Sequence, residues 1–274
     1  MTVAGDGTHE QPIASPYLLT AVTDGRSPRV SVTGDAGMTV VEMAVHGRWS
    51  PQLGQQVSAA LSMCMAGPPT AIVVALHDLG DPPGASLPFW LALWRQARLE
   101  TVPVHVAFSI AGTTVLSRRL RYLRGPQPRV YSTVAEARAA IVARRDRTDR
   151  LQAWLEPRPA SVEAARTLVT RACDAWDRPK LLQDAWLIAS ELAANAFEHA
   201  RTDFIVTMSR SDTRLHLAIH DCVSSFPAAS ELRLAEQPAK LGERGRGLRL
   251  VHATAAAWGA VPTPDGKVVW AAVA

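Results

Sequence analysis

The sequence predicts an α/β protein built from two domains. Strands and helices alternate along residues 38–146, which is the pattern of an α/β layer with a parallel or mixed sheet. The apolar rhythm then stops in a charged stretch, and a different order of elements follows, with two long helices ahead of a series of strands. The chain has 274 residues. At roughly 150 residues per domain, this length predicts about two domains.

The first domain, residues 38–146, is predicted from its strand and helix signals. The continuous apolar run Ala71–Leu76 is typical of a strand that is buried on both faces. Ser86 is an expected helix N-cap, and Thr133 with Glu136 three residues later forms a capping box. The predicted elements are strands at 39–45, 71–76, 104–108 and 129–131, and helices at 53–65, 87–99, 113–123 and 133–143.

Two segments flank this domain. Residues 1–37 are rich in Gly, Pro, Ser and Thr with little periodicity, which favours a largely disordered segment with one strand near 29–32. Residues 147–154 follow a charged stretch and are expected to form the linker to the second domain.

The second domain is expected to cover residues 155–274. An amphipathic pattern predicts a helix over 161–176 with Ser161 as its N-cap, and Pro179 opens a long helix that reaches Ala200. The elements expected after it are strands at 203–209 and 214–220, a polar loop at 222–246, a helix at 248–257 and a hairpin that pairs 260–262 with 268–273.

Composition excludes several classes of protein. Apolar residues make up 47% of the chain and charged residues 20%. These shares are ordinary for a globular protein. No apolar run reaches the roughly 18 residues that a helix needs to span a bilayer. The first residues lack the basic and apolar regions of a secretory signal, so we expect a cytoplasmic protein without membrane contact.

Cysteine and arginine usage narrows the choice further. The three cysteines are widely separated, which argues against disulfides and zinc sites. The arginines lack interleaved aromatic residues on which bases could stack, which argues against direct nucleic-acid binding.

Three polar residues recur every fourth position in the long helix of the second domain. Because four residues turn a helix by nearly one full turn, Glu191, Asn195 and His199 are expected to share a face. An amide oxygen suits Mg²⁺, and a carboxylate one turn away can accept a proton from an attacking hydroxyl. The competing interpretation is a solvated polar helix face, and His199 is interpreted as structural.

Two further features follow along the chain. Asp221 ends an apolar strand, where a carboxylate can accept the amino group of adenine or simply begin a loop. Residues 242–248, Gly-Glu-Arg-Gly-Arg-Gly-Leu, precede a predicted helix, where glycines and a helix N-terminus favour contact with phosphate. A flexible glycine-rich helix start is the alternative.

The order of these features resembles the GHKL (histidine kinase and Hsp90-like) ATPases. The segments SELAANAFEHA, AIHDC and GERGRGLRLVHATAAAWG…GKVVWAAV are similar to the anti-sigma-factor serine kinase group. The resemblance implies a GHKL (Bergerat) α/β sandwich, an open sheet with helices on one face that binds ATP with Mg²⁺. The residues that it implies are Glu191 as catalytic base, Asn195 as the Mg²⁺ ligand, Asp221 as the adenine contact, and Gly242, Arg244, Gly245, Arg246, Gly247 and Leu248 as the phosphate-binding segment.

The second domain departs from this family at its first glycine box. The family pattern is D-x-G-x-G, whereas this chain has Asp221-Cys222-Val223-Ser224-Ser225 without a glycine. The β-branched Val223 is expected to narrow the adenine end of the site.

The first domain resembles STAS domains, the fold of anti-sigma-factor antagonists, in its order of elements and in the segment VEMAVHGRWS. In those antagonists a serine of a D-S-S-G motif accepts phosphate from the kinase. Here the corresponding residues are Asp81-Pro82-Pro83-Gly84, which have no hydroxyl. Ser86 lies two residues further on, either as a displaced phosphoacceptor or as a plain helix cap.

Two functions follow from the resemblances. The first is a serine/threonine protein kinase that binds a sigma factor, or phosphorylates a separate STAS-domain antagonist, with ATP and Mg²⁺ as cofactors. The second is a non-catalytic interaction scaffold with degenerate STAS and ATPase halves. Either function allows a contact between the two domains of one chain, and a homodimer. A sensor histidine kinase is disfavoured because no helix pair with a phosphoacceptor histidine is present.

Overall fold

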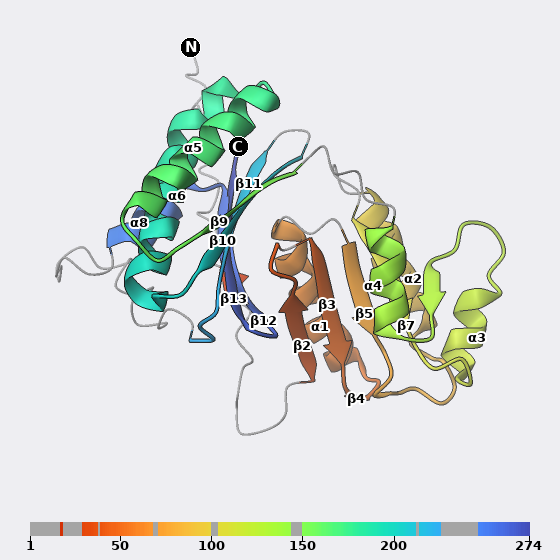
Figure 1. Cartoon of the computed structure of the whole chain (residues 1–274). Coiled ribbons are helices and arrows are strands. Elements are labelled where there is room, and N and C mark those ends of the chain that lie inside the picture. The colour runs from red at the N-terminus through yellow and green to blue at the C-terminus, as the bar shows by residue number, and fades with distance from the viewer. Residues whose placement is uncertain are drawn as a thin grey trace, which may run out of the picture.

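The computed structural model describes residues 17–18, 29–37, 39–67, 71–99, 104–143, 150–211, 214–225 and 246–274; of residues 17, 18 and 246 it describes the backbone alone. Figure 1 shows two α/β units, each with its own main sheet. The predicted two-domain α/β class is therefore confirmed. None of the helices in these residues is long and apolar enough to cross a membrane.

The first sheet has five strands in the order β2-β3-β5-β7-β8. Neighbouring strands from β3 to β8 pair in parallel, while β2 pairs antiparallel with β3. The strands are β2 (Val30–Gly34), β3 (Val40–Val45), β5 (Ala71–Ala75), β7 (His105–Ser109) and β8 (Arg129–Tyr131). The central strand β5 is buried along its whole length, as its apolar run predicts.

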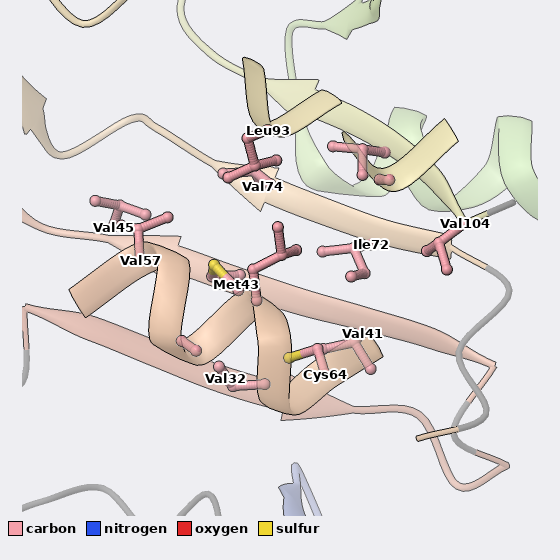
Figure 2. Close-up of a cluster of buried hydrophobic side chains, with 14 of the residues drawn as sticks. Val32, Val41, Met43, Val45, Val57, Cys64, Ile72, Val74, Leu93 and Val104 are labelled. Carbon is pink, nitrogen blue, oxygen red and sulfur yellow. The ribbon is translucent and has the colours of Figure 1, made fainter. Parts of the chain in front are cut away.

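Helices cover both faces of this sheet: α1 (Pro51–Ala66), α2 (Leu87–Leu99), α3 (Val115–Arg121) and α4 (Val134–Val142). Side chains of α1, α2 and α3 share one core with the strands, and Figure 2 shows part of it, with Val57 and Cys64 of α1 facing Met43 and Ile72. The helix α4 packs on the opposite face through Ala137. A two-residue pair, β4 (Gly47–Arg48) with β6 (Leu79–Gly80), forms a separate short ladder.

The second sheet has six strands in the order β1-β12-β13-β11-β10-β9. Every pair from β9 to β12 is antiparallel, and β1 pairs in parallel with β12. The strands are β1 (Tyr17–Leu18), β9 (Arg150–Leu155), β10 (Phe204–Arg210), β11 (Leu215–Asp221), β12 (Ala257–Thr263) and β13 (Gly266–Val273).

One face of the second sheet is covered by α5 (Ala160–Ala175), α6 (Leu182–Asn195) and α8 (Arg246–Thr254), as the resemblance implied. A short 3₁₀ turn, Pro179–Leu181, leads into α6, and a π-helical turn, Ala196–Ala200, follows it. The strands alternate accordingly: Leu215, Leu217 and Ile219 of β11 point into the core beneath these helices.

The opposite face of the second sheet is covered by the first domain. Ala218 of β11 and Val268, Trp270 and Ala272 of β13 belong to the same buried cluster as the side chains of α1. A Cβ atom at Gly67, the residue after α1, would lie 3.2 Å from the indole ring of Trp270. The two units therefore share one continuous hydrophobic core, and an intramolecular contact between the domains is present.

Several boundaries differ from the sequence prediction. Residues 150–155, most of which fell in the expected linker at 147–154, form the edge strand β9. Residues 30–34 of the segment expected to be largely disordered form β2, in line with the strand predicted near 29–32; most of that segment lies outside the described residues. The helix expected at 248–257 is α8, which ends at Thr254 because Ala257 begins β12.

The helix caps are partly as predicted. Thr133 caps α4 by accepting a hydrogen bond from the Glu136 amide at 3.1 Å. Ser161 is not an N-cap: α5 begins at Ala160, and the Ser161 hydroxyl donates instead to the Glu156 carbonyl at 2.6 Å.

Candidate functional site

The helix α6 presents Glu191 and Asn195 on the side that faces α8. Its apolar positions, including Ile188 and Leu192, are buried against the sheet, which leaves both polar side chains half-buried. The α-helix ends at Asn195, and the π-helical turn after it interrupts the regular four-residue repeat. His199, which lies in that turn, is exposed.

The first turn of α8 lies directly against this pair. A Cβ atom built on Gly247 would lie 2.7 Å from Glu191 Oε2 and 3.6 Å from Asn195 Oδ1. A side chain at this position would displace the carboxylate, so glycine allows the close approach that the structure shows. The helix N-terminus, whose first N–H groups have no partner within the helix, is thereby brought next to a carboxylate and an amide.

Burial and neighbouring charges tune Glu191. Partial burial raises the pKa of its carboxyl, the negative charge of Glu198 raises it further, and Arg166 opposes both. Arg166 lies on α5, and its Nε donates a hydrogen bond to Ser190 Oγ of α6 at 2.7 Å. The Ser190 hydroxyl in turn donates to the Trp186 carbonyl at 2.6 Å. A raised pKa makes this carboxylate a better proton acceptor. Sequence reasoning missed Arg166, because its position depends on how α5 packs on α6.

Asp221 lies at the end of β11 with 4% of its surface exposed. Its Oδ1 accepts hydrogen bonds from the Val223 amide at 2.9 Å and from the Lys267 ammonium at 2.9 Å. Lys267 also donates to the Val223 carbonyl at 3.0 Å. Asp221 and Lys267 are directly opposite each other in the β11–β13 ladder.

The turn before Lys267 is also constrained. A Cβ atom on Gly266 would overlap the Asp221 carbonyl oxygen, so glycine is required there. Sequence reasoning missed Lys267, although a single lysine between this glycine and an apolar strand was a visible signal.

The remaining predicted site residues are only partly described. Gly242, Arg244 and Gly245 lie outside the described residues, and of Arg246 only the backbone is placed, at the first position of α8. Leu248 packs against the core beneath the helices, so it supports α8 from below.

The residues present fit a Mg²⁺–phosphate group at one end of the site. Asn195 offers an amide oxygen, Glu191 a carboxylate, and α8 its N-terminus, which are suitable partners for Mg²⁺ and for phosphate oxygens. Within the described ranges no three His, Cys, Asp or Glu side chains gather to hold a metal. The other end, at Asp221, is already engaged by Lys267.

The candidate phosphoacceptor of the first domain is enclosed. Ser86 has 0% of its surface exposed, accepts from Trp90 Nε1 at 2.8 Å and donates its hydroxyl proton to Asp81. It directly precedes α2, where a cap was expected, yet in the described part of the chain its hydroxyl bonds to these side chains and to no helix amide. The Asp81 carboxylate instead accepts the amides of Ala85 and Ser86. Pro82 and Pro83 are exposed on the loop between.

Comparisons with known proteins give one family match and a distant structural one. A search of the curated proteins gave no significant match. Among solved structures, the crystal structure of an anti-sigma factor antagonist from Mycobacterium paratuberculosis matches with 18% identity and a TM-score of 0.30, covering 47% of this chain and 98% of that chain. Residues 155–273 match the family model described as the histidine kinase-like ATPase domain. The match covers the second domain, from the last residue of β9 to the end of β13, so this part of the chain is similar to histidine kinase-like ATPase domains.

Proposed function

We propose that this protein is an ATP-binding regulatory protein kinase of the anti-sigma-factor type, which transfers phosphate to a serine of a separate STAS-domain antagonist. The observation that carries the proposal is the contact of Gly247 with Glu191 and Asn195. It sets a proton acceptor, a metal-ligand amide and a helix N-terminus side by side, which is the set of groups that phosphoryl transfer needs.

Each residue has a distinct role in this proposal. Asn195 and the start of α8 would hold Mg²⁺ and the phosphates, and the metal would supply charge neutralisation to the transferred group. Glu191 would orient the incoming serine hydroxyl and accept its proton, and its raised pKa suits that role. Arg166, which contacts Ser190 beside Glu191, limits the rise and so keeps the carboxyl closer to its ionised form.

The substrate is proposed to be another protein because the first domain offers no accessible hydroxyl in its Asp81–Gly84 loop. Ser86 is fully buried in hydrogen bonds to Asp81 and Trp90, so a kinase could reach it only if the start of α2 opened. Phosphorylation of the first domain at the usual position is therefore not expected.

The test is Glu191→Gln, with Glu156→Gln as the matched control. Glu156 lies just before α5 and its exposed carboxylate pairs with the exposed Arg158, so its substitution should leave the reaction unchanged. Glu191→Gln should lower the rate of phosphate transfer from radiolabelled Mg·ATP to STAS-domain antagonists by about 10²–10⁴-fold, because one proton-transfer group is lost. Nucleotide affinity should stay within a few fold. Equal rates for wild type and Glu191→Gln would exclude Glu191 as the base.

A non-catalytic scaffold is the second candidate, and the Asp221–Lys267 ion pair favours it. In that case the Glu191–Asn195 pair would only hold a ligand. Wild-type protein that binds Mg·ATP but transfers no phosphate to any of the antagonists would support the scaffold and contradict the kinase.

A further inference from the structure

The Asp221–Lys267 ion pair faces the nucleotide side of the second sheet. Ile219, two residues before Asp221, and Val269, two residues after Lys267, both pack in the core beneath α5, α6 and α8. Because side chains alternate along a strand, Asp221 and Lys267 lie on that same helix-covered face. The side chain of Lys267 is only 11% exposed and that of Asp221 only 5%.

A base contact at Asp221 would have to use Oδ2, because both hydrogen bonds that Asp221 accepts go to Oδ1. Asp221 Oδ1 accepts from the Val223 amide and from the Lys267 ammonium, both at 2.9 Å. A base that displaced Lys267 would leave the buried ammonium with the Val223 carbonyl as its remaining partner among the described residues. Removing the partner of a buried charge costs more than one new hydrogen bond from an amino group returns. Lys267 therefore stays bound to Asp221 when a base contacts Oδ2.

The ion pair also removes the charge difference on which base selection would rest. A lone carboxylate favours the amino group of adenine over the carbonyl that guanine carries at the same position, because it attracts a donor and repels an acceptor. With Lys267 bound at 2.9 Å, Asp221 presents a neutralised pair instead.

We propose that Lys267 abolishes adenine selectivity in this domain. The ligand is held by its Mg²⁺–polyphosphate end, through Asn195 and the start of α8, and ATP and GTP bind alike. This inference rests on the proposed nucleotide site, since it concerns which nucleotides that site accepts.

Calorimetric titration with Mg·ATP, Mg·GTP and Mg·tripolyphosphate tests the proposal. In the wild type, the affinities for ATP and GTP should agree within about threefold, because no base contact distinguishes them. Lys267→Thr removes the ammonium and leaves a small hydroxyl, so the Asp221 carboxylate presents its full negative charge to the base. This variant should prefer ATP over GTP by roughly tenfold, which corresponds to one hydrogen bond to a charged group.

Two matched variants complete the experiment. Lys180→Thr replaces an exposed lysine of the turn before α6 and should show the wild-type ratio. The double variant Asp221→Asn/Lys267→Met keeps the shape of the pair without its charges, and it should also bind ATP and GTP alike. Circular dichroism of each variant checks that the fold is kept. The ratio of ATP to GTP affinity in the wild type tests the proposal even if a variant does not fold.

The outcomes separate the two proposals. A wild type that prefers ATP by tenfold, or a folded Lys267→Thr variant whose ratio stays at the wild-type value, would overturn the role of Lys267 while leaving the nucleotide site intact. If neither nucleotide nor tripolyphosphate binds to any variant, the proposed nucleotide-binding function fails, and this inference fails with it.

Discussion

Asp81 in the first domain and Asp221 in the second are both buried carboxylates at the start of a loop, yet they are satisfied in different ways. Asp81, 9% exposed, accepts neutral donors within five residues of itself, namely the amides of Ala85 and Ser86 and the Ser86 hydroxyl. Asp221 accepts an ammonium group that comes from a strand 46 residues away. The first arrangement closes a local loop, whereas the second joins two strands through charge.

The comparison shows which of the two carboxylates a single substitution can free from its partner. A loop held by several short-range hydrogen bonds has no single group whose removal exposes the carboxylate. In the ion pair, the ammonium of Lys267 is such a group, and a single substitution at Lys267 would leave the Asp221 carboxylate without its cation. Glu191, which is half-buried, has no ion pair among the described residues, although the charge of Arg166 lowers its pKa.

The largest expected effect is that of Asp221→Ala on stability. It leaves the Lys267 ammonium buried without its anionic partner, and breaking a buried pair in this way costs about 3–5 kcal/mol. Urea denaturation measures the change in the free energy of unfolding. The double variant Asp221→Asn/Lys267→Met should recover most of the loss, because it removes both charges. A loss below about 1 kcal/mol for Asp221→Ala would show that the ammonium finds another partner.

Asp81→Ala should have the next largest effect. The amides of Ala85 and Ser86 and the hydroxyl of Ser86 all lose their acceptor at a buried position. The free energy of unfolding should fall by about 3 kcal/mol in total once water reaches part of the loop.

Asp78→Ala is the matched control for Asp81→Ala, since the exposed side chain of Asp78 pairs with His46 at the surface. Its effect on the free energy of unfolding should stay within about 0.5 kcal/mol. Equal losses for the two variants would mean that the Asp81 network does not support α2.

The sequence alone predicted the elements that depend on local chemistry. The strand at Ala71–Ala75 and the Thr133 cap follow from residues within one segment. The prediction of Ser161 as a cap was wrong because α5 starts one residue earlier, with Pro159 at the N-cap position. The Ser161 hydroxyl therefore donates to the Glu156 carbonyl, which precedes the helix. An apolar periodicity places a helix but does not decide which of two neighbouring residues begins it.

Contacts between distant segments could not be predicted in the same way. The proposed site residues Glu191 and Asn195 were found because they lie one turn apart on one helix. Lys267 and Arg166 were missed because their partners come from a facing strand and a packed helix. Trp270 lies on the apolar outer face of the second sheet, and its sequence pattern is that of an ordinary buried strand. Only the folded structure shows that the first domain covers this face.

Gly67→Val sharpens the comparison by testing whether the two carboxylates belong to one cooperative unit. Because one core spans both sheets, Asp81→Ala and Asp221→Ala should lower a single unfolding transition. A side chain at Gly67 would press on the buried Trp270 ring. Such overpacking costs about 1–3 kcal/mol. Calorimetry of Gly67→Val should therefore show a lower Tm and a broadened or split transition.

The control for this contact is Gly112→Val. A Cβ atom at Gly112 would meet nothing within 4 Å, so the same added side chain should change the Tm little. A split transition in the wild type itself would mean that the two domains unfold independently in spite of their shared core.

The smallest expected effect on stability is that of protonating His216, because a proton is added and no side chain is lost. It lies on β11 with 8% exposure, and its Nδ1 has no hydrogen-bond partner among the described residues. Burial, assisted by the positive charge of Arg214, lowers the pKa of the imidazole to about 4. The unfolded chain has the ordinary pKa of about 6.5, so below that pH the unfolded state binds more protons than the folded state.

The sign of the effect follows from this difference. The contribution of neutral His216 to stability is complete above about pH 6.5 and is lost progressively as the pH falls toward about 4. Near pH 5.5 the loss should be about 1.4 kcal/mol. Urea denaturation between these limits should show this slope in the wild type and a shallower one in His216→Gln, which cannot gain a proton. His199→Gln, at an exposed position of the π-helical turn, should keep the wild-type slope. If His216→Gln and the wild type lose the same stability as the pH falls, the acid sensitivity arises from other groups. The outer face of the second sheet would then accept a protonated His216 in spite of its burial.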